Sequence, residues 1–205
     1  QRWRIEVALR DPRLTTQEAK ELLESNLEEV ATLQLMTDNL LSLARNKELG
    51  EQKITELSRV LKSATKNHAP KIKKAGMTFE EKYQSGLKAM INKDALQQAV
   101  GILIDNSIKY AGNGAKIEVK LEECDGYGHL TISDNGIGIP DDQLECIFQR
   151  FYKVDYSRTS SKQQGHGLGL SIAQQLVVAL RGRISARKNH RGGGIEFLIE
   201  LPLLV

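Results

Sequence analysis

The feature that most constrains the fold is a change of hydrophobic period in the middle of the chain. Residues 93–111 repeat apolar side chains at helical spacing, whereas 116–122 and 129–133 alternate apolar and polar side chains as strands do. The other expected elements are strands at 77–83, 87–91, 183–187 and 195–201, a helix at 55–74 that is interrupted or ends near Pro70, short helices around 141–148, and a helix from Gly169. Together they predict an α+β fold, a mixed sheet covered by helices on one face.

The first 46 residues have a different pattern, which predicts a helical hairpin. Asp11-Pro12 ends a first helix, because proline disfavours helical geometry in the residue before it. Residues 17–46 then read as one long amphipathic helix. Its apolar stripe consists of Leu23, Leu27, Val30, Leu33, Met36, Leu40 and Leu43. We expect a hairpin domain at 1–46 and a second domain at 47–205, with the stripe covered either in a four-helix dimer or by the second domain.

Composition narrows the possible functions. Apolar residues make up 40% of the chain and charged residues 27%, as in soluble folded proteins. The formal charge of +3, without a dense Lys/Arg stripe, argues against a nucleic-acid partner. The two cysteines form no metal motif and fit a reducing compartment. No apolar run approaches the roughly 20 residues of a membrane span. Because the chain starts at Gln1 without a methionine, we expect a cytoplasmic segment of a longer protein.

Two polar segments stand out in the central helix and after the strand that follows. Late in the helix, Asn106 offers an amide oxygen that can coordinate Mg²⁺, and Lys109 and Tyr110 can contact phosphate and a nucleotide. After the strand comes Asp134-Asn135-Gly136-Ile137-Gly138-Ile139-Pro140. A carboxylate at a strand end can accept a hydrogen bond from an exocyclic amine, and glycines let backbone approach a flat ring. The alternatives are a surface asparagine and a glycine-rich turn capped by the aspartate.

Two further segments follow. An aromatic cluster that includes Phe151 and Tyr152 precedes a polar stretch with Arg158, whose guanidinium can hold phosphate through two hydrogen bonds. A core cluster followed by an ordinary loop would look the same. Gly165-His166-Gly167-Leu168-Gly169 then opens a helix, whose unpaired backbone N–H groups form an anion site. This segment lacks the Gly-Lys-Ser/Thr of a P-loop and the preceding strand of a dinucleotide motif.

Together these segments resemble the N, G1, F and G2 boxes of the histidine kinase catalytic domain, in that family's order. The matching elements are Asn-x-x-Lys-Tyr, Asp-x-Gly-x-Gly-Ile-Pro, Arg-Phe-Tyr-Lys and Gly-x-Gly-Leu-Gly-Leu. The resemblance covers about residues 50–205, and 1–46 resembles the end of the family's dimerisation and phosphotransfer domain. It implies a Bergerat-type α/β sandwich preceded by a helical hairpin, a sensor histidine kinase activity, and use of ATP with Mg²⁺.

The resemblance also implies roles for individual residues. Asn106 would bind Mg²⁺, Lys109 and Tyr110 would contact phosphate and nucleotide, and Asp134 would hold N6 of adenine. The other implied ATP-binding positions are Gly136, Gly138, Ile139, Arg158, Gly165, His166, Gly167, Leu168 and Gly169. The implied partners are the receiver domain of a response regulator and a second copy of the chain, joined through the hairpin. The full-length protein would lie in the cell membrane.

The sequence departs from the family pattern at two places. Ile102 stands where many members carry a second asparagine, one helical turn before Asn106. The family's phosphoacceptor histidine has an acidic neighbour, which none of the four histidines of this chain has; these are His68, His129, His166 and His190. We expect the acceptor upstream of Gln1, so that this chain by itself does not autophosphorylate.

Two other functions use the same pocket. ATP-hydrolysing relatives that resemble gyrase, mismatch-repair proteins or chaperones need a carboxylate to activate water, one helical turn before the metal-binding asparagine. Ile102 occupies that position, and an alkyl group takes no proton. A non-enzymatic module would bind only ATP and receiver domains. Release of free phosphate distinguishes the hydrolase from the kinase, and transfer of labelled phosphate to a separate histidine-bearing hairpin distinguishes the kinase from the non-enzymatic module.

Overall fold

The computed structural model describes residues 15–17, 19, 22, 23, 51–154, 167–189 and 192–204. The chain divides into two units, Gln1–Lys47 and Glu48–Val205. In the first unit, residues 16, 17, 19, 22 and 23 are helical, and the Ala19 N–H donates to the Thr15 carbonyl at 3.0 Å. The rest of the predicted hairpin lies outside the described residues. Among the helices that are described, none is long and apolar enough to span a bilayer.

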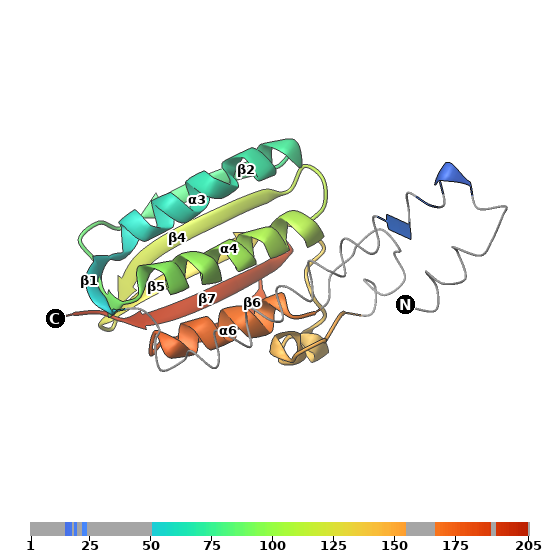
Figure 1. Ribbon diagram of the computed structural model, residues 1–205. Coiled ribbons are helices and arrows are strands. Elements are labelled where there is room, and N and C mark those ends of the chain that lie inside the picture. Colours follow the sequence, from blue (N-terminus) through green and yellow to red (C-terminus); the bar gives the residue numbers. More distant parts are fainter. Residues whose placement is uncertain are drawn as a thin grey trace. The chain divides into compact units, whose positions relative to one another are not determined.

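The second unit is a mixed sheet with helices on one face (Figure 1). Its elements are β1 (Lys53–Glu56), α3 (Leu57–Lys74), β2 (Thr78–Tyr83), β3 (Lys88–Ile91), α4 (Lys93–Tyr110), β4 (Lys116–Cys124), β5 (Tyr127–Asp134), η1 (Asp141–Gln143), η2 (Cys146–Phe148), α6 (Gly169–Ala179), β6 (Arg183–Lys188) and β7 (Ile195–Pro202). The main sheet has the order β2-β4-β5-β7-β6, and β1 pairs with β3 in a separate ribbon. Strand β2 runs parallel to β4, while the other neighbours are antiparallel. The predicted fold class is confirmed.

Helix α4 lies between α3 and α6 and covers the middle of the sheet (Figure 1). The Asn92 side chain caps its start by accepting a hydrogen bond from the Ala95 N–H at 2.9 Å. Leu96, Val100, Leu103 and Ser107 are buried on one side, as the helical spacing predicts. This burial fixes the rotation of α4 about its axis, and therefore the direction in which its polar residues point.

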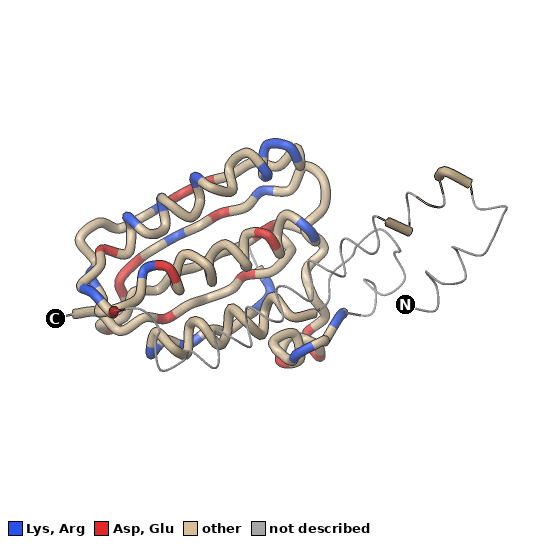
Figure 2. The backbone as a smooth tube through the Cα atoms, viewed as in Figure 1, with Lys and Arg blue, Asp and Glu red and all other residues tan. Residues whose placement is uncertain are grey.

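Strand β5 is the central strand of the sheet, flanked by β4 and β7. Leu130 and Ile132 are buried on the helix-covered face, as are Phe197 and Ile199 of the neighbouring β7. Asp134 is the last residue of β5 and pairs with Ile117 of β4. The strand pairing therefore holds Asp134 at the edge of the core. Figure 2 shows that positive and negative residues are interspersed along the described elements.

Two expectations about the elements are wrong. Helix α3 continues through Pro70 to Lys74, although a proline normally interrupts a helix. Pro70 and Lys66, four residues earlier, are both exposed, so water can bind the carbonyl that the proline leaves without a donor. Strand β1 was not expected. Residues 53–56 form it by pairing with β3, a tertiary contact that local periodicity does not reveal.

Candidate functional site

The Asp134 carboxylate is buried at the end of β5, with 3% of the residue exposed. Its Oδ2 accepts a hydrogen bond from the Ser107 hydroxyl of α4 at 2.8 Å. Its Oδ1 accepts from the N–H of Gly136 at 3.0 Å and from the N–H of Ile195, the first residue of β7, at 3.4 Å. A buried charge requires such donors, because burial without them is costly. Three separate segments thus hold this carboxylate in place.

Burial also raises the pKa of Asp134. The hydrogen bonds from Ser107, Gly136 and Ile195 act in the opposite direction, because they favour the ionised form. A carboxylate that is poised in this way can accept a hydrogen bond from an amine of a ligand. It loses that capacity at one oxygen when it is protonated.

Two glycines allow this close packing around Asp134. A Cβ on Gly194 would lie 2.3 Å from the carbonyl oxygen of Asp134 and 2.6 Å from its Oδ1. A Cβ on Gly136 would lie 2.3 Å from the Ala111 Cα, just after α4. The sequence interpretation had linked Gly136 to the approach of a flat ring. In the structure, Gly136 also packs against the backbone of Ala111, where a Cβ would not fit.

Helix α4 presents its predicted site residues on a half-buried side. Ile102 and Asn106 are one turn apart and lie on the same side. The Ile102 Cγ2 would be 3.3 Å from a Cβ on Gly169, so this side of α4 lies against the start of α6. Toward the end of the helix, the Lys109 Nζ lies 5.2 Å from the ring centroid of Tyr110, and burial raises the pKa of Tyr110.

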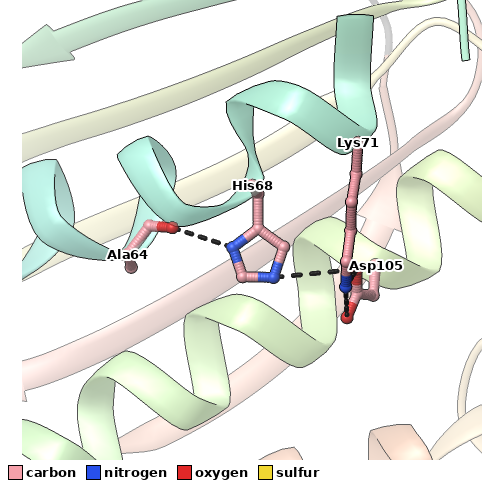
Figure 3. Close-up of polar contacts among 4 residues, drawn as sticks. All are labelled: Ala64, His68, Lys71 and Asp105. Atoms are coloured by element: carbon pink, nitrogen blue, oxygen red, sulfur yellow. Dashed lines mark hydrogen bonds and ion pairs between the residues drawn. The ribbon is translucent and has the colours of Figure 1, made fainter. Parts of the chain in front are cut away.

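A different side of α4 carries Asp105, which faces α3 (Figure 3). Its carboxylate lies 2.9 Å from the Lys71 Nζ and 3.6 Å from the His68 Nε2. Burial would raise the pKa of Asp105, but His68 and Lys71 together lower it. The nearby Asp105 carboxylate in turn raises the pKa of His68. Asp105 is therefore engaged with α3, whereas its neighbour Asn106 lies on the side that meets α6.

The start of α6 is built for close approach. Gly167 has a φ of +69°, and a Cβ there would lie 2.5 Å from the Tyr152 carbonyl oxygen. The Phe151 N–H donates to the Gly167 carbonyl at 2.9 Å. No side chain of the described residues caps the helix at Leu168. The first N–H groups of a helix can bind an anion.

The predicted site residues fall into two groups. A chain of contacts connects Asp134 to Ser107, then along α4 to Asn106 and Ile102, and from there to Gly169. Gly138 belongs to the same region, because a Cβ there would lie 2.9 Å from the Gly194 carbonyl oxygen, and Ile139 is half-buried against the core. The predictions for Arg158, Gly165 and His166 fall outside the described residues.

Sequence reasoning missed residues that hold Asp134. No role in the site was predicted for Ser107 or Gly194, although both contact Asp134. Asn189 was not considered, yet its side-chain amide donates to the Asp134 carbonyl at 2.8 Å. A hydroxyl inside an apolar stripe is a usable signal, because a buried polar group needs a partner.

Comparison with known proteins places the chain in a family. The family model described as "Histidine kinase-, DNA gyrase B-, and HSP90-like ATPase" matches residues 91–205. The chain belongs to this family, and its relatives include sensor proteins and a signal transduction histidine-protein kinase. One is the sensor protein CiaH of Streptococcus pneumoniae, 33% identical over 193 residues, which cover 94% of this chain and 43% of CiaH. The chain thus carries the ATPase catalytic domain of a sensor histidine kinase and spans less than half of that relative.

Solved structures agree with this assignment. The histidine kinase AdeS of Acinetobacter baumannii is 25% identical with a TM-score of 0.66, and the match covers 94% of this chain and 87% of AdeS. The histidine kinase ThkA, solved in complex with the response regulator protein TrrA, is 21% identical with a TM-score of 0.71, covering 98% of this chain and 55% of ThkA. The second likeness shows a shared fold.

Proposed function

We propose that this chain transfers the γ-phosphoryl group of ATP to a histidine, for relay to an aspartate of a response-regulator receiver domain. In this proposal Asp134 holds N6 of adenine, and Lys109 and Tyr110 contact phosphate and nucleotide. The segment that ends in Gly167, Leu168 and Gly169 receives the phosphates at the start of α6. The supporting observation is the chain of contacts from the buried Asp134 carboxylate through α4 to the start of α6.

The proposed Mg²⁺ ligand from the protein is Asn106. The described residues contain no group of three or more His, Cys, Asp or Glu that could enclose a metal. A Mg²⁺ ion that keeps several waters and binds phosphate oxygens needs only one or two protein ligands, so a single amide oxygen beside an anion site fits it. The ion would neutralise charge on the transferring phosphoryl group. The protein's own contribution is mainly positioning of the nucleotide.

The proposed phosphoacceptor lies on a separate helical segment. Of the histidines that the structure describes, His68 is engaged with Ala64 and Asp105 between α3 and α4. His129 lies 3.6 Å from Glu200 on the sheet. His166 and His190 lack the acidic neighbour of the family's acceptor. We therefore propose that this chain does not autophosphorylate and acts on a histidine supplied to it.

The partners belong to the same proposal. ThkA, which shares the fold, was solved with a response regulator protein, and the receiver domain of such a regulator is the partner we propose here. We also propose that the full-length protein forms a homodimer through its helical hairpin. Leu23, part of the predicted apolar stripe, is 62% exposed. The family resemblance further suggests a place in the cell membrane, with this chain on the cytoplasmic side.

A transfer experiment tests the proposal. The chain is mixed with γ-labelled ATP, Mg²⁺ and a separate helical hairpin that carries a histidine with an acidic neighbour. Label should appear on the hairpin in an acid-labile form, and Asn106→Ala should abolish it. Released phosphate is measured in parallel. Rapid phosphate release without label on the hairpin would favour a hydrolase, although the half-buried Ile102 offers no carboxylate to activate water.

A further inference from the structure

Ser107 follows Asn106 in α4 and points toward the sheet. Its side chain is buried, with 1% of the residue exposed, among the apolar residues of that side. The Oγ lies 2.8 Å from Oδ2 of Asp134. The hydroxyl must be the donor, because an ionised carboxylate only accepts hydrogen bonds. Alanine would satisfy the packing and favour the helix more, so the hydroxyl is best explained by its contact with Asp134.

The contacts of Asp134 leave a defined part of its carboxylate for a ligand. A carboxylate has about four acceptor positions, two on each oxygen. Both positions on Oδ1 are used, by the N–H groups of Gly136 at 3.0 Å and Ile195 at 3.4 Å. Within the described part of the chain, Oδ2 accepts only from Ser107. One position on Oδ2 is therefore open, and the Ser107 hydroxyl determines its direction.

We propose that Ser107 is a positioning residue for adenine recognition, which orients Oδ2 of Asp134 so that its one open acceptor position meets the exocyclic amine. This inference rests on the proposed ATP-binding function and deepens it. Burial raises the pKa of Asp134. The hydrogen bond from Ser107 acts in the opposite direction and so keeps the carboxyl ionised to lower pH. Because Ser107 adjoins Asn106, it connects the adenine contact to the helix that carries the proposed metal ligand.

The test compares Ser107→Ala with a matched control, Ser58→Ala. Ser58 is also buried, with 5% exposed, and its hydroxyl donates to a carboxylate oxygen of Glu56 at 3.0 Å, at the start of α3. ATP affinity is measured by calorimetry over a range of pH. Ser107→Ala should bind ATP about tenfold more weakly at neutral pH, the scale expected for a hydrogen bond to a charged group. Its loss of affinity on acidification should begin at higher pH, whereas Ser58→Ala should match the unaltered chain.

A second measurement does not depend on nucleotide binding. The carboxyl pKa of Asp134 is followed by ¹³C NMR without ATP, and it should rise in Ser107→Ala. Ser107→Cys keeps the side-chain volume but has a weak donor, so its Asp134 pKa should lie between those of the unaltered chain and Ser107→Ala. An unchanged pKa together with unchanged ATP affinity would overturn the role of Ser107, and so would an equal loss of affinity in Ser58→Ala. Failure of the unaltered chain to bind ATP would instead overturn the proposed function, and the NMR titration would still decide whether Ser107 controls Asp134.

Discussion

Two neighbouring glycines, Gly193 and Gly194, differ in how closely they pack against Asp134. The Gly193 and Gly194 positions both have positive φ angles, +78° and +80°. Only at Gly194 would a Cβ collide with Asp134, at 2.3 Å from its carbonyl oxygen; at Gly193 the nearest atom is 3.5 Å away. A side chain would therefore strain the backbone at both glycines, but it would collide with Asp134 only at Gly194.

This pair gives a prediction about stability. Gly193→Ala should lower the free energy of unfolding by about 1 kcal/mol, because alanine is strained at positive φ. Gly194→Ala should lower it by roughly 3 kcal/mol or more and should also weaken ATP binding, because the clash displaces Asp134. Urea unfolding of the two variants measures the difference. Equal losses would show that the tight contact at Gly194 is not required.

Asp134 gives a second prediction, in which two properties change in opposite directions with pH. Burial raises its pKa above the ordinary value of 3.8, so the folded chain binds this proton more readily than the unfolded chain. Acidification through the raised pKa should therefore increase this group's contribution to stability while it decreases ATP affinity. Asp134→Asn should remove both trends and weaken ATP binding by about a hundredfold. Calorimetry and urea unfolding across the acidic range measure the two quantities.

At the scale of elements, α4 has three differently used sides. One packs on the sheet through Leu103 and Ser107, one meets α6 through Ile102, and one is tied to α3 through Asp105 (Figure 3). Gly101 allows the α3 contact, because a Cβ there would lie 3.0 Å from the His68 Cε1. The position of α4 is thus set by both neighbouring helices and by the sheet.

The contact between α3 and α4 should depend on pH. The His68 Nδ1 lies 2.8 Å from the Ala64 carbonyl and donates to it, so protonation is needed for Nε2 to donate toward Asp105 as well. The Asp105 carboxylate raises the pKa of His68, so the stabilisation from this ion pair is complete below the ordinary value of 6.5 and is lost as pH rises through the raised pKa. Burial would raise the pKa of Asp105, but His68 and Lys71 lower it below the ordinary value of 3.8. The stabilisation from this carboxylate is therefore lost as pH falls below 3.8.

His68→Gln should therefore remove about 1 kcal/mol of stability at pH between 3.8 and 6.5, and less at alkaline pH. Urea unfolding at several pH values measures this effect. Lys71→Met is the control, since it removes a cation from the same carboxylate without a group that titrates near neutrality. A stability difference that does not vary with pH would contradict the assigned protonation of His68.

At the scale of the whole molecule, sequence periodicity predicted more of the fold than of the site. Periodicity predicted α4 from residues 93–111, and β4 and β5 from 116–122 and 129–133, because the buried sides of these elements follow one simple repeat. It did not give β1 or the parallel pairing of β2 with β4, which depend on distant partners. The glycine motifs indicated the region of the site. Two of the three donors to Asp134 were missed, because Ser107 and Ile195 carry no motif of their own.

ATP should stabilise the whole Glu48–Val205 unit, because its proposed site joins α4, β5, α6 and β7. At a free concentration of one hundred times the dissociation constant, ATP should add about 2.7 kcal/mol to the free energy of unfolding. Thermal unfolding with and without ATP and Mg²⁺ measures this shift. Asp134→Asn serves as the control and should show little stabilisation. A shift of equal size in that variant would place the nucleotide elsewhere.

The hydrogen bonds of Asp134 also have a consequence for biosynthesis. Two of its three donors are distant in the sequence: Ser107 stands 27 residues before it and Ile195 stands 61 residues after it. A ribosome that has made the chain only as far as β6 has not yet supplied the Ile195 N–H or the Gly194 backbone. The nascent domain therefore lacks the complete proposed nucleotide site until β7 has been added, and ATP should stabilise only the finished domain.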